Sequence, residues 1–488
     1  MHIVDTTVII LYFLFIALVG YIARRKVKTQ NDFFLGGQRF KKFMMSMMFF
    51  GAGTNTDQVV AVTSKIYQVG LSGIWYQWLY LFISPFYWLK LPIVRRLRMM
   101  TTADFFKERY SKSLGICYAV IGTITVAVNI GLMLKGTGFV IDAISLHQLP
   151  ANWAILAVAA LFVFYGVLGG LVAAVWTDAI QGMLTLVLSF LLIPFMLVKV
   201  GGMSSLHYQL EQVRGLTHAF SLVSPGDISV LFIFTITLNG LVGMFTQPQV
   251  MQTGGSCKTE MDGRTGSLVG TVLKRVCTVA WAFIGVGAIY LFPGLSHPDL
   301  AFGEMIRALL PVGLMGLMVA AILAAVMSSC DVLMVTGTAL FIRNIYRNII
   351  TRELTEEKFL LISRFVSVGV VLLGIIIAFL LPGVVAGLEL FWKLNAFTGF
   401  AFWAGLVWKR ANVSGAWASI IGSVTVWITL EMLGASLPVQ MLSYIGAGFI
   451  LLVIVSLLTG KYPSRDTERF YRKLRTPIGA DPELDVIR

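Results

Sequence analysis

A run of small and polar residues, Gly-Ala-Gly-Thr-Asn-Thr-Asp-Gln, occupies residues 51–58 inside a segment that is otherwise apolar enough to cross a membrane, residues 43–69. Glycine weakens a helix interior, and Asn, Thr and Asp side chains compete with the helix for backbone groups. In hydrocarbon the freed backbone groups must be satisfied within the protein, so irregular backbone at that depth lines a cavity or a site. We interpret the run as a broken helix whose bare carbonyls hold a cation and whose side chains face a solute. The alternative is a straight helix whose polar stripe packs against its neighbours.

A second run, residues 324–331, combines small residues with two adjacent hydroxyls, Ser328 and Ser329, and ends in Asp331. Small residues permit close approach to another helix. Two hydroxyls beside a free carbonyl are hard oxygen ligands of the kind that Na⁺ takes, although serines in membrane helices commonly bond back to their own helix. Together with a broken helix elsewhere, the pair predicts half of a cation site.

Ionisable residues inside the apolar segments are further candidates, because each costs about 2.5–3.5 kcal/mol at the bilayer centre and therefore faces the bundle interior. We count Asp57, Lys65, Lys135, Asp178, Lys274, Asp331, Glu389, Lys393 and Glu431. Lys65, Lys135 and Glu431 lie near segment ends, where a side chain can reach the interface. Asp178 falls in the first turns of its segment, and its alternative role is that of a helix N-terminal acid.

The composition places these residues in a polytopic helical membrane protein. The chain has 488 residues, of which 57% are hydrophobic and 13% charged, against about 25% charged in a soluble domain. The first apolar run, residues 4–22, lacks a basic segment before it and a small-residue cleavage site after it, so we expect a retained helix. The four cysteines and five histidines show no disulfide framework or metal-ligand spacing.

The net charge of +14 lies in short segments between the apolar runs. That distribution follows the positive-inside rule and argues against a nucleic-acid surface. We count about thirteen spans, which puts the N-terminus outside and the C-terminus in the cytoplasm. These spans are residues 4–22, 43–69, 72–94, 114–145, 152–170, 172–199, 227–250, 265–292, 312–342, 358–381, 384–408, 413–434 and 438–459.

We expect the seventh span to break in its middle as well, at Asn-Gly-Leu-Val-Gly, residues 239–243. Two interrupted spans at corresponding positions indicate an inverted-repeat transporter with a site at the bilayer midplane. Glycines that only allow close helix packing are the alternative. We expect the loop 200–226 to be external and to contain a short surface helix. We expect the tail beyond Arg475 to be mostly disordered.

The domain organisation that follows has six parts. They are an N-terminal helix and loop (1–42), a first five-helix repeat (43–199), an external loop (200–226), a second repeat (227–410), C-terminal helices (411–460) and a cytoplasmic tail (461–488).

The segment Gly-Gly-Leu-Val-Ala-Ala-Val-Trp-Thr-Asp-Ala-Ile-Gln, residues 169–181, and the run 325–329 carry a family resemblance. The chain resembles the sodium/solute symporter family, which includes sodium/glucose, sodium/galactose, sodium/proline and sodium/sialic acid transporters, over about residues 1–460. Residues 101–110 and 408–410 match as well. The resemblance implies an all-α fold with an extra N-terminal helix, two inverted five-helix repeats with broken first helices, and added C-terminal helices.

Carried over by position, the resemblance implies a sodium site. Its ligands are the backbone carbonyls of Gly51, Thr54 and Ala325 and the hydroxyls of Ser328 and Ser329. Asp178 matches an aspartate of a second sodium site or of the sodium exit path. Asp331 and Val332 stand where two-sodium members usually carry hydroxyls, so Asp331 either replaces a ligand, binds a proton or pairs with a cation from another helix.

For the solute, the resemblance is to the sugar-transporting branch, whose polar pocket positions fall at Gln58, Gln77, Asn239 and Lys274. Gln77 replaces an acid, Glu389 stands for a glutamine, and Val242 and Gly243 replace an aromatic gate. Amide and ammonium groups suit hydroxyl-rich or carboxylated solutes, whereas an ionised Asp57 favours a positive group.

The expected function is sodium-coupled import of a small polar organic solute, a sugar or sugar acid, by alternating access. The alternatives are a proton-coupled or amino-acid or organic-acid symporter of the same fold, and a solute sensor. A selectivity filter and an enzyme-like constellation are both missing from the sequence. We expect a lipid bilayer and a small solute as partners, no nucleic acid or obligate protein partner, and a bacterial inner membrane.

Overall fold

The computed structural model describes residues 2–24, 36–51, 53–166, 170–213, 218–224, 226–349, 356–460, 465–481 and 483–484. Its helices in chain order are α1 (Ile3–Arg24), η1 (Gly36–Gln38), α3 (Lys42–Gly51), α4 (Thr56–Val69), η2 (Leu71–Ile74), α5 (Trp75–Trp78), α6 (Ser84–Leu97), α7 (Thr102–Arg109), α8 (Lys112–Ile144), α9 (Ala151–Gly166), α10 (Gly170–Val200), α11 (Met203–Tyr208), η3 (Gln209–Val213), α12 (Val230–Gly243), α13 (Val250–Gly255), α14 (Glu260–Leu291), η4 (Pro298–Leu300), α15 (Ala301–Leu309), α16 (Leu314–Ala339), η5 (Leu340–Tyr346), α17 (Arg347–Ile349), α18 (Glu356–Leu380), α19 (Val384–Phe397), α20 (Gly399–Val407), α21 (Val413–Met432), α22 (Leu437–Thr459) and α23 (Arg465–Arg475).

The fold is all-α over the described part of the chain, where β-structure is limited to two isolated bridges. Seven of the described helices are long and apolar enough to cross a membrane, and shorter apolar helices accompany them. The expected membrane protein is therefore confirmed. The count of thirteen spans and the inverted repeats stay predictions.

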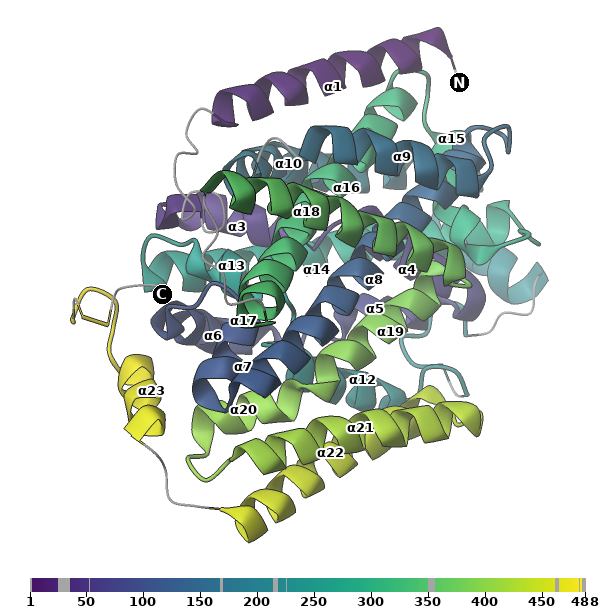
Figure 1. The fold of residues 1–488 in the computed structure, drawn as a ribbon. Coiled ribbons are helices and arrows are strands. Elements are labelled where there is room, and N and C mark those ends of the chain that lie inside the picture. The colour runs from purple at the N-terminus through teal and green to yellow at the C-terminus, as the bar shows by residue number, and fades with distance from the viewer. Residues whose placement is uncertain are drawn as a thin grey trace.

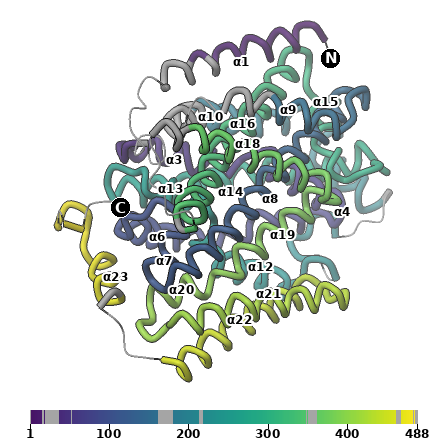
Figure 2. Tube along the Cα trace, viewed as in Figure 1, coloured from purple at the N-terminus to yellow at the C-terminus, as the bar shows by residue number. Residues whose placement is uncertain are grey.

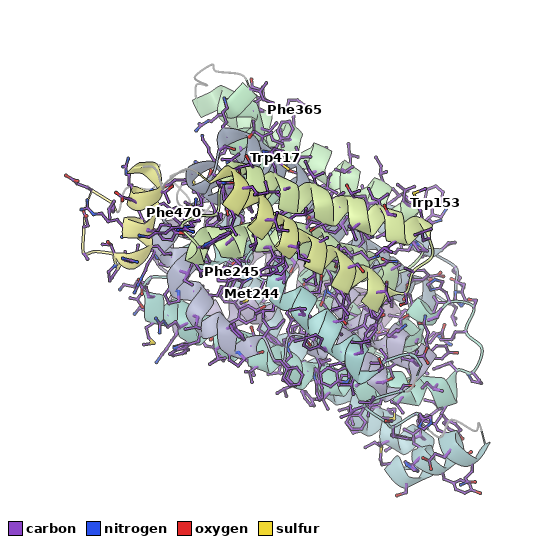
Figure 3. All side chains as sticks on the ribbon, turned by 90° about the horizontal axis from the view of Figure 1, so that it is seen from below. Trp153, Met244, Phe245, Phe365, Trp417 and Phe470 are labelled. Carbon is purple, nitrogen blue, oxygen red and sulfur yellow. The ribbon has the colours of Figure 1, made fainter. Side chains whose placement is uncertain are left out.

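Helix α16 lies at the centre of the bundle. In its continuous helical segment Leu314–Tyr346, 94% of the most apolar window is buried, against 28% for Leu361–Leu380 and for Val413–Met432. Helix α1 lies along one side of the molecule, and α21 and α22 lie along the opposite side (Figure 1, Figure 2). Trp153 and Phe365, 65% and 71% exposed, lie at the periphery in Figure 3. Apolar side chains at that rim are suited to contact lipid.

The first expected break is confirmed. Helix α3 ends at Gly51, α4 begins at Thr56, and residues 53–55 are not helical. The break is shorter than the polar run, because the extended backbone of Asn55 (φ −81°, ψ 170°) lets its carbonyl accept from the Gln58 amide at 3.0 Å and so start a new helix.

The second break was expected at residues 239–243, and this position is wrong. Helix α12 continues through Gly243, and the chain leaves the helix at residues 244–249. The α12 glycines serve close packing, since a Cβ at Gly240 would lie 2.6 Å from Leu79 Cδ1. The interruption instead precedes and includes Pro248, whose ring and missing amide end a helix.

Helix α1 fixes the start of α16. The buried Asp5 carboxylate accepts from the backbone amides of Gly313 at 2.7 Å and Gly316 at 2.9 Å through its Oδ1 atom. These amides belong to the first turn of α16 and its cap, which have no partner within the helix. The N-terminal helix thus supplies the cap of the central helix.

The loop 200–226 forms the expected short helix α11, and Leu206 and Leu210 are fully buried. The expectation of disorder beyond Arg475 does not hold for residues 476–481. There the Arg98 guanidinium donates to the carbonyls of Thr476 at 3.3 Å and Pro477 at 3.1 Å. Phe470 of α23, labelled in Figure 3, is fully buried.

Candidate functional site

The break between α3 and α4 borders a small cavity on the side of α16. The cavity has a volume of about 30 Å³ for the centres of water molecules, enough for a water or a small ion. It brings Thr54 and Ala325 together. Its walls come from Thr54, Thr56, Val59, Thr185, Leu188, Ser189, Trp281, Phe302, Met318, Ala321, Ile322 and Ala325.

The other residues of the expected sodium site are not among the walls of this cavity. The Gly51 carbonyl accepts from the Thr54 amide at 3.1 Å and from the Thr54 hydroxyl at 3.4 Å. Ser328 and Ser329 are buried on α16, one turn beyond Ala325. Ser329 Oγ donates to Asn55 Oδ1 at 2.7 Å and so joins α16 to the break. A hydroxyl that donates its only proton in this way keeps its lone pairs for a cation.

The two candidates for a second cation or proton site lie on different helices. Asp178 falls in the first three turns of α10, and its side chain is outside the described residues. Asp331 is 5% exposed on α16, two positions after Ser329.

A larger cavity lies on the other side of the break. It has a volume of about 120 Å³ on the same measure, and six segments of the chain enclose it. Of the expected solute residues, Gln58 and Lys274 line it. Its walls are Phe49, Gly53, Asn55, Gln58, Tyr80, Tyr87, Lys90, Asn129, Met133, Gln247, Gln249, Val250, Thr253, Thr271, Lys274, Arg275, Leu388, Phe391 and Trp392.

Lys274, Gln58 and Asp57 form a chain of hydrogen bonds at the edge of this central cavity. Lys274 Nζ donates to Gln58 Oε1 at 3.1 Å, and Gln58 Nε2 donates to Asp57 Oδ2. The second carboxylate oxygen of Asp57 is buried without a hydrogen-bond partner among the described residues. Gly53 leaves room for this chain, since a Cβ there would lie 2.9 Å from Lys274 Cδ.

The remaining expected solute residues do not line the central cavity. Asn239 Oδ1 accepts from Tyr444 Oη at 2.6 Å, and Glu389 Oε1 accepts from Tyr76 Oη at 2.7 Å. Both positions therefore join helices. Gln77 is fully buried, and its two side-chain polar atoms have no hydrogen-bond partner in the described part of the chain.

Two cations of the central cavity, Lys90 and Arg275, are missing from our sequence-based list of ionisable residues. Both lie inside expected spans, at residues 72–94 and 265–292, so a complete count of charges in the spans would have included them. No local sequence pattern could show that six segments of the chain converge on one cavity.

The start of α3 is held against the segment that precedes α14. The Phe40 carbonyl accepts from the Lys258 amide at 2.9 Å, and Asp262 Oδ1 accepts from the Lys42 amide at 3.0 Å. Phe40, Met45, Met48, Cys257 and Val332 form an apolar cluster beneath these bonds. We call this contact between residues 40–42 and 256–262 the α3 latch.

Two cavities border the broken helix, one with hydroxyl groups in its walls and the other with amide and ammonium groups. Residues 33–422 match the family model described as Sodium:solute symporter family. The chain belongs to the sodium:solute symporter family. Sodium is accordingly the coupling ion, and symport of a solute with Na⁺ across a membrane is the activity of the family.

Three relatives of this symporter span most of its length. It is 26% identical over 463 residues to the sodium/myo-inositol cotransporter 2 of Rattus norvegicus, covering 86% of this chain and 68% of the relative. It is 24% identical to the sodium/glucose cotransporter of Vibrio parahaemolyticus, with 93% and 90% covered. It is 25% identical to the osmoregulated proline transporter OpuE of Bacillus subtilis, with 95% of each chain covered.

The fold of the symporter has a counterpart among solved structures. A Na⁺-coupled sialic acid symporter in a substrate-bound outward-open state superposes with a TM-score of 0.81 at 20% identity, over 95% of this chain and 99% of the other. At that identity the likeness establishes the fold alone.

Proposed function

We propose that this symporter imports a small polar organic solute, a sugar or a sugar acid, together with Na⁺ by alternating access. The observation that carries the proposal is the Ser329–Asn55 hydrogen bond of 2.7 Å. Ser329 belongs to the expected sodium site, and Asn55 lines the central cavity. One bond thus joins the proposed ion site to the proposed solute site. The glucose and myo-inositol transport in the names of two relatives supports the solute class.

The proposed sodium ligands are the carbonyls of Gly51, Thr54 and Ala325 and the hydroxyls of Ser328 and Ser329. Sodium bound there would hold α16 against the break and complete the solute pocket. The proximity of Thr54 to Ala325 across the small cavity supports this set. Asp178 lies on the proposed exit path of the ion, and Asp331 on α16 is the proposed second cation or proton site.

The proposed solute residues fall in two groups. Gln58, Lys274 and the adjoining Asp57 offer amide, ammonium and carboxylate groups at the central cavity. The second group lies outside the lining of this cavity and consists of Gln77, Asn239 and Glu389. We propose that these residues take part in solute binding when α12 and α19 move. The bare amide of Gln77 supports a role in binding, because an unsatisfied buried polar group is costly to keep.

We propose an N-terminus outside and a C-terminus in the cytoplasm of a bacterial inner membrane, on the strength of the basic loops. One Na⁺ crossing about 100 mV supplies roughly 2.3 kcal/mol, and a tenfold sodium gradient adds about 1.4 kcal/mol. Together they support about a 500-fold accumulation of a neutral solute. One sodium ion is therefore enough for uptake of a neutral solute.

Thermal stabilisation of the purified protein tests the proposal. A ligand that binds the folded state raises its apparent stability by RT ln(1 + [L]/Kd), so a solute library with and without Na⁺ ranks ligands by affinity. We expect sodium-dependent ligands, with the sodium dependence lost in Ser328→Ala. Stabilisation that ignores Na⁺, follows pH and loses its pH dependence in Asp331→Asn would assign the coupling in this chain to protons instead.

A further inference from the structure

The central cavity carries an excess of positive charge. Three cations line it, Lys90, Lys274 and Arg275, with exposed fractions of 2%, 8% and 6%. Its described lining contains no Asp or Glu. Asp57 adjoins it through Gln58, and with that carboxylate counted the formal charges of these side chains leave an excess of two positive charges.

The partners of Lys90 and Arg275 that the structure records are neutral. Lys90 Nζ donates to the Met244 carbonyl and lies 5.0 Å from the Tyr87 ring centroid and 5.7 Å from that of Phe245. Figure 3 labels Met244 and Phe245 side by side in the middle of the bundle. A carbonyl and two ring faces can solvate an ammonium, but they do not neutralise it.

Arg275 has the same kind of surroundings. Its Nη1 donates to the Gln77 carbonyl, and its Cζ lies 5.4 Å from the Tyr80 ring centroid. Its Nε has no hydrogen-bond partner among the described residues. Tyr87, which lies against Lys90, and Tyr80, which lies against Arg275, both line the central cavity. Each of the two cations therefore lies beside an aromatic ring of the cavity wall.

Buried cations without a counter-charge are costly in a membrane protein and mark a binding function. An arginine guanidinium matches a carboxylate, which it can bind through two parallel hydrogen bonds. The Lys274–Gln58 pair lines the same cavity with donors and acceptors that suit hydroxyl groups. The two sets of groups together describe a solute with an acidic end and a hydroxylated end.

We infer that the solute is a small organic anion, a carboxylate that carries hydroxyl groups, and that Arg275 and Lys90 receive its carboxylate. This inference rests on the proposed function, from which it selects the sugar acid over the neutral sugar. One Na⁺ and one such monoanion carry no net charge together.

Matched pairs of solutes test the inference by thermal stabilisation of the full chain in Na⁺ buffer. The probes are D-glucose with D-glucuronate and D-galactose with D-galacturonate. We expect at least one acid to bind at least about tenfold more tightly than its neutral partner. Arg275→Gln and Lys90→Gln should each weaken that acid by about tenfold to a hundredfold, the usual range for a hydrogen bond to a charged group.

Arg264→Gln is the matched control, because Arg264 lies on the same helix, 5.5 Å from the Trp88 ring centroid, and does not line the cavity. Arg275→Lys should retain more of the acid affinity than Arg275→Gln. Stabilisation by Na⁺ alone verifies that each variant is folded, and Lys90→Gln provides the test if Arg275→Gln does not fold.

The outcomes separate the inference from the proposed function. Neutral sugars that bind in Na⁺ buffer with the affinity of their acids would overturn the inference, and so would neutral sugars that bind only when chloride is present. In either case the solute is not the anion, while the proposal of symport stands. The same holds if neither cavity variant weakens an acid. If no solute binding depends on Na⁺, the proposed coupling fails and the inference fails with it.

Discussion

Asn55 is expected to control sodium affinity although it supplies no sodium ligand. Its Oδ1 accepts the Ser329 hydroxyl proton at 2.7 Å, which turns the lone pairs of that hydroxyl away from Asn55 and leaves them for the ion. In Asn55→Ala the hydroxyl can rotate and donate to the carbonyl four residues earlier, as serines in helices do. That carbonyl belongs to Ala325, itself a proposed ligand.

The size of the effect follows from this bond. A buried neutral hydrogen bond contributes about 0.5–1.5 kcal/mol, so Asn55→Ala should weaken Na⁺ binding by about three- to tenfold. Ser329→Ala should weaken it at least as much. Because the two residues act through one bond, the double variant should cost less than the sum of the single variants.

Equilibrium binding of radioactive ²²Na⁺ to the purified protein measures these affinities without a known solute. Ser367→Ala is the control, since it removes a buried hydroxyl that bonds Thr338 of α16 at 2.8 Å, two turns beyond the site. It should leave sodium affinity unchanged. An Asn55→Ala protein that binds Na⁺ as tightly as the parent would refute the orienting role, and strictly additive variants would refute the shared bond.

Three further predictions concern the elements around the site. Gly270→Ala puts a Cβ 2.5 Å from the Ser46 carbonyl oxygen and 2.8 Å from the Phe50 amide nitrogen, so α3 must move. We expect a loss of about 1–3 kcal/mol in unfolding free energy, measured by thermal unfolding against Gly369→Ala, which meets nothing within 4 Å. Asp5→Ala removes the cap of α16 and should cost about 0.5–2 kcal/mol; an unfolding temperature equal to that of the parent would contradict the capping role. Burial raises the pKa of the Cys257 thiol to about 11 from 9.0, so at pH 8 its thiolate should be about a hundredfold scarcer than in the unfolded chain. In a variant that keeps Cys257 as its only cysteine, maleimide labelling should accordingly be slow and should become faster as the pH rises. It should also become faster when Gly270→Ala loosens the α3 latch. A labelling rate as high as in denaturant would exclude a closed latch.

The sequence predicts the break between α3 and α4 because local chemistry decides it. Residues 51–58 hold two glycines and competing polar side chains, which together weaken a continuous helix. The interruption after α12 was misplaced for the opposite reason. Its glycines fit either an irregular backbone or a close helix contact, and only the position of Leu79 against Gly240 shows that they serve the contact.

The solute residues show where a local pattern stops being informative. Gln58 and Lys274 lie at the cavity, but Asn239 and Glu389 bond the phenols of Tyr444 and Tyr76. Those tyrosines lie far away in the sequence, so no spacing around Asn239 or Glu389 could reveal that their polar groups are used between helices.

The same comparison explains why the sequence alone did not predict the positive charge of the cavity. Lys90 lies near the end of an expected span, where a lysine usually reaches the interface, and Arg275 follows Lys274 directly. Their common feature is burial against neutral groups. Other segments contribute the Met244 and Gln77 carbonyls and the Tyr80 ring, and the Tyr87 ring comes from the same helix as Lys90. A residue pattern can count the charges in a membrane segment, whereas the absence of a counter-charge becomes visible only when all the walls of a cavity are known. In this symporter that missing counter-charge, and not the position of any one residue, points to the acidic end of the solute.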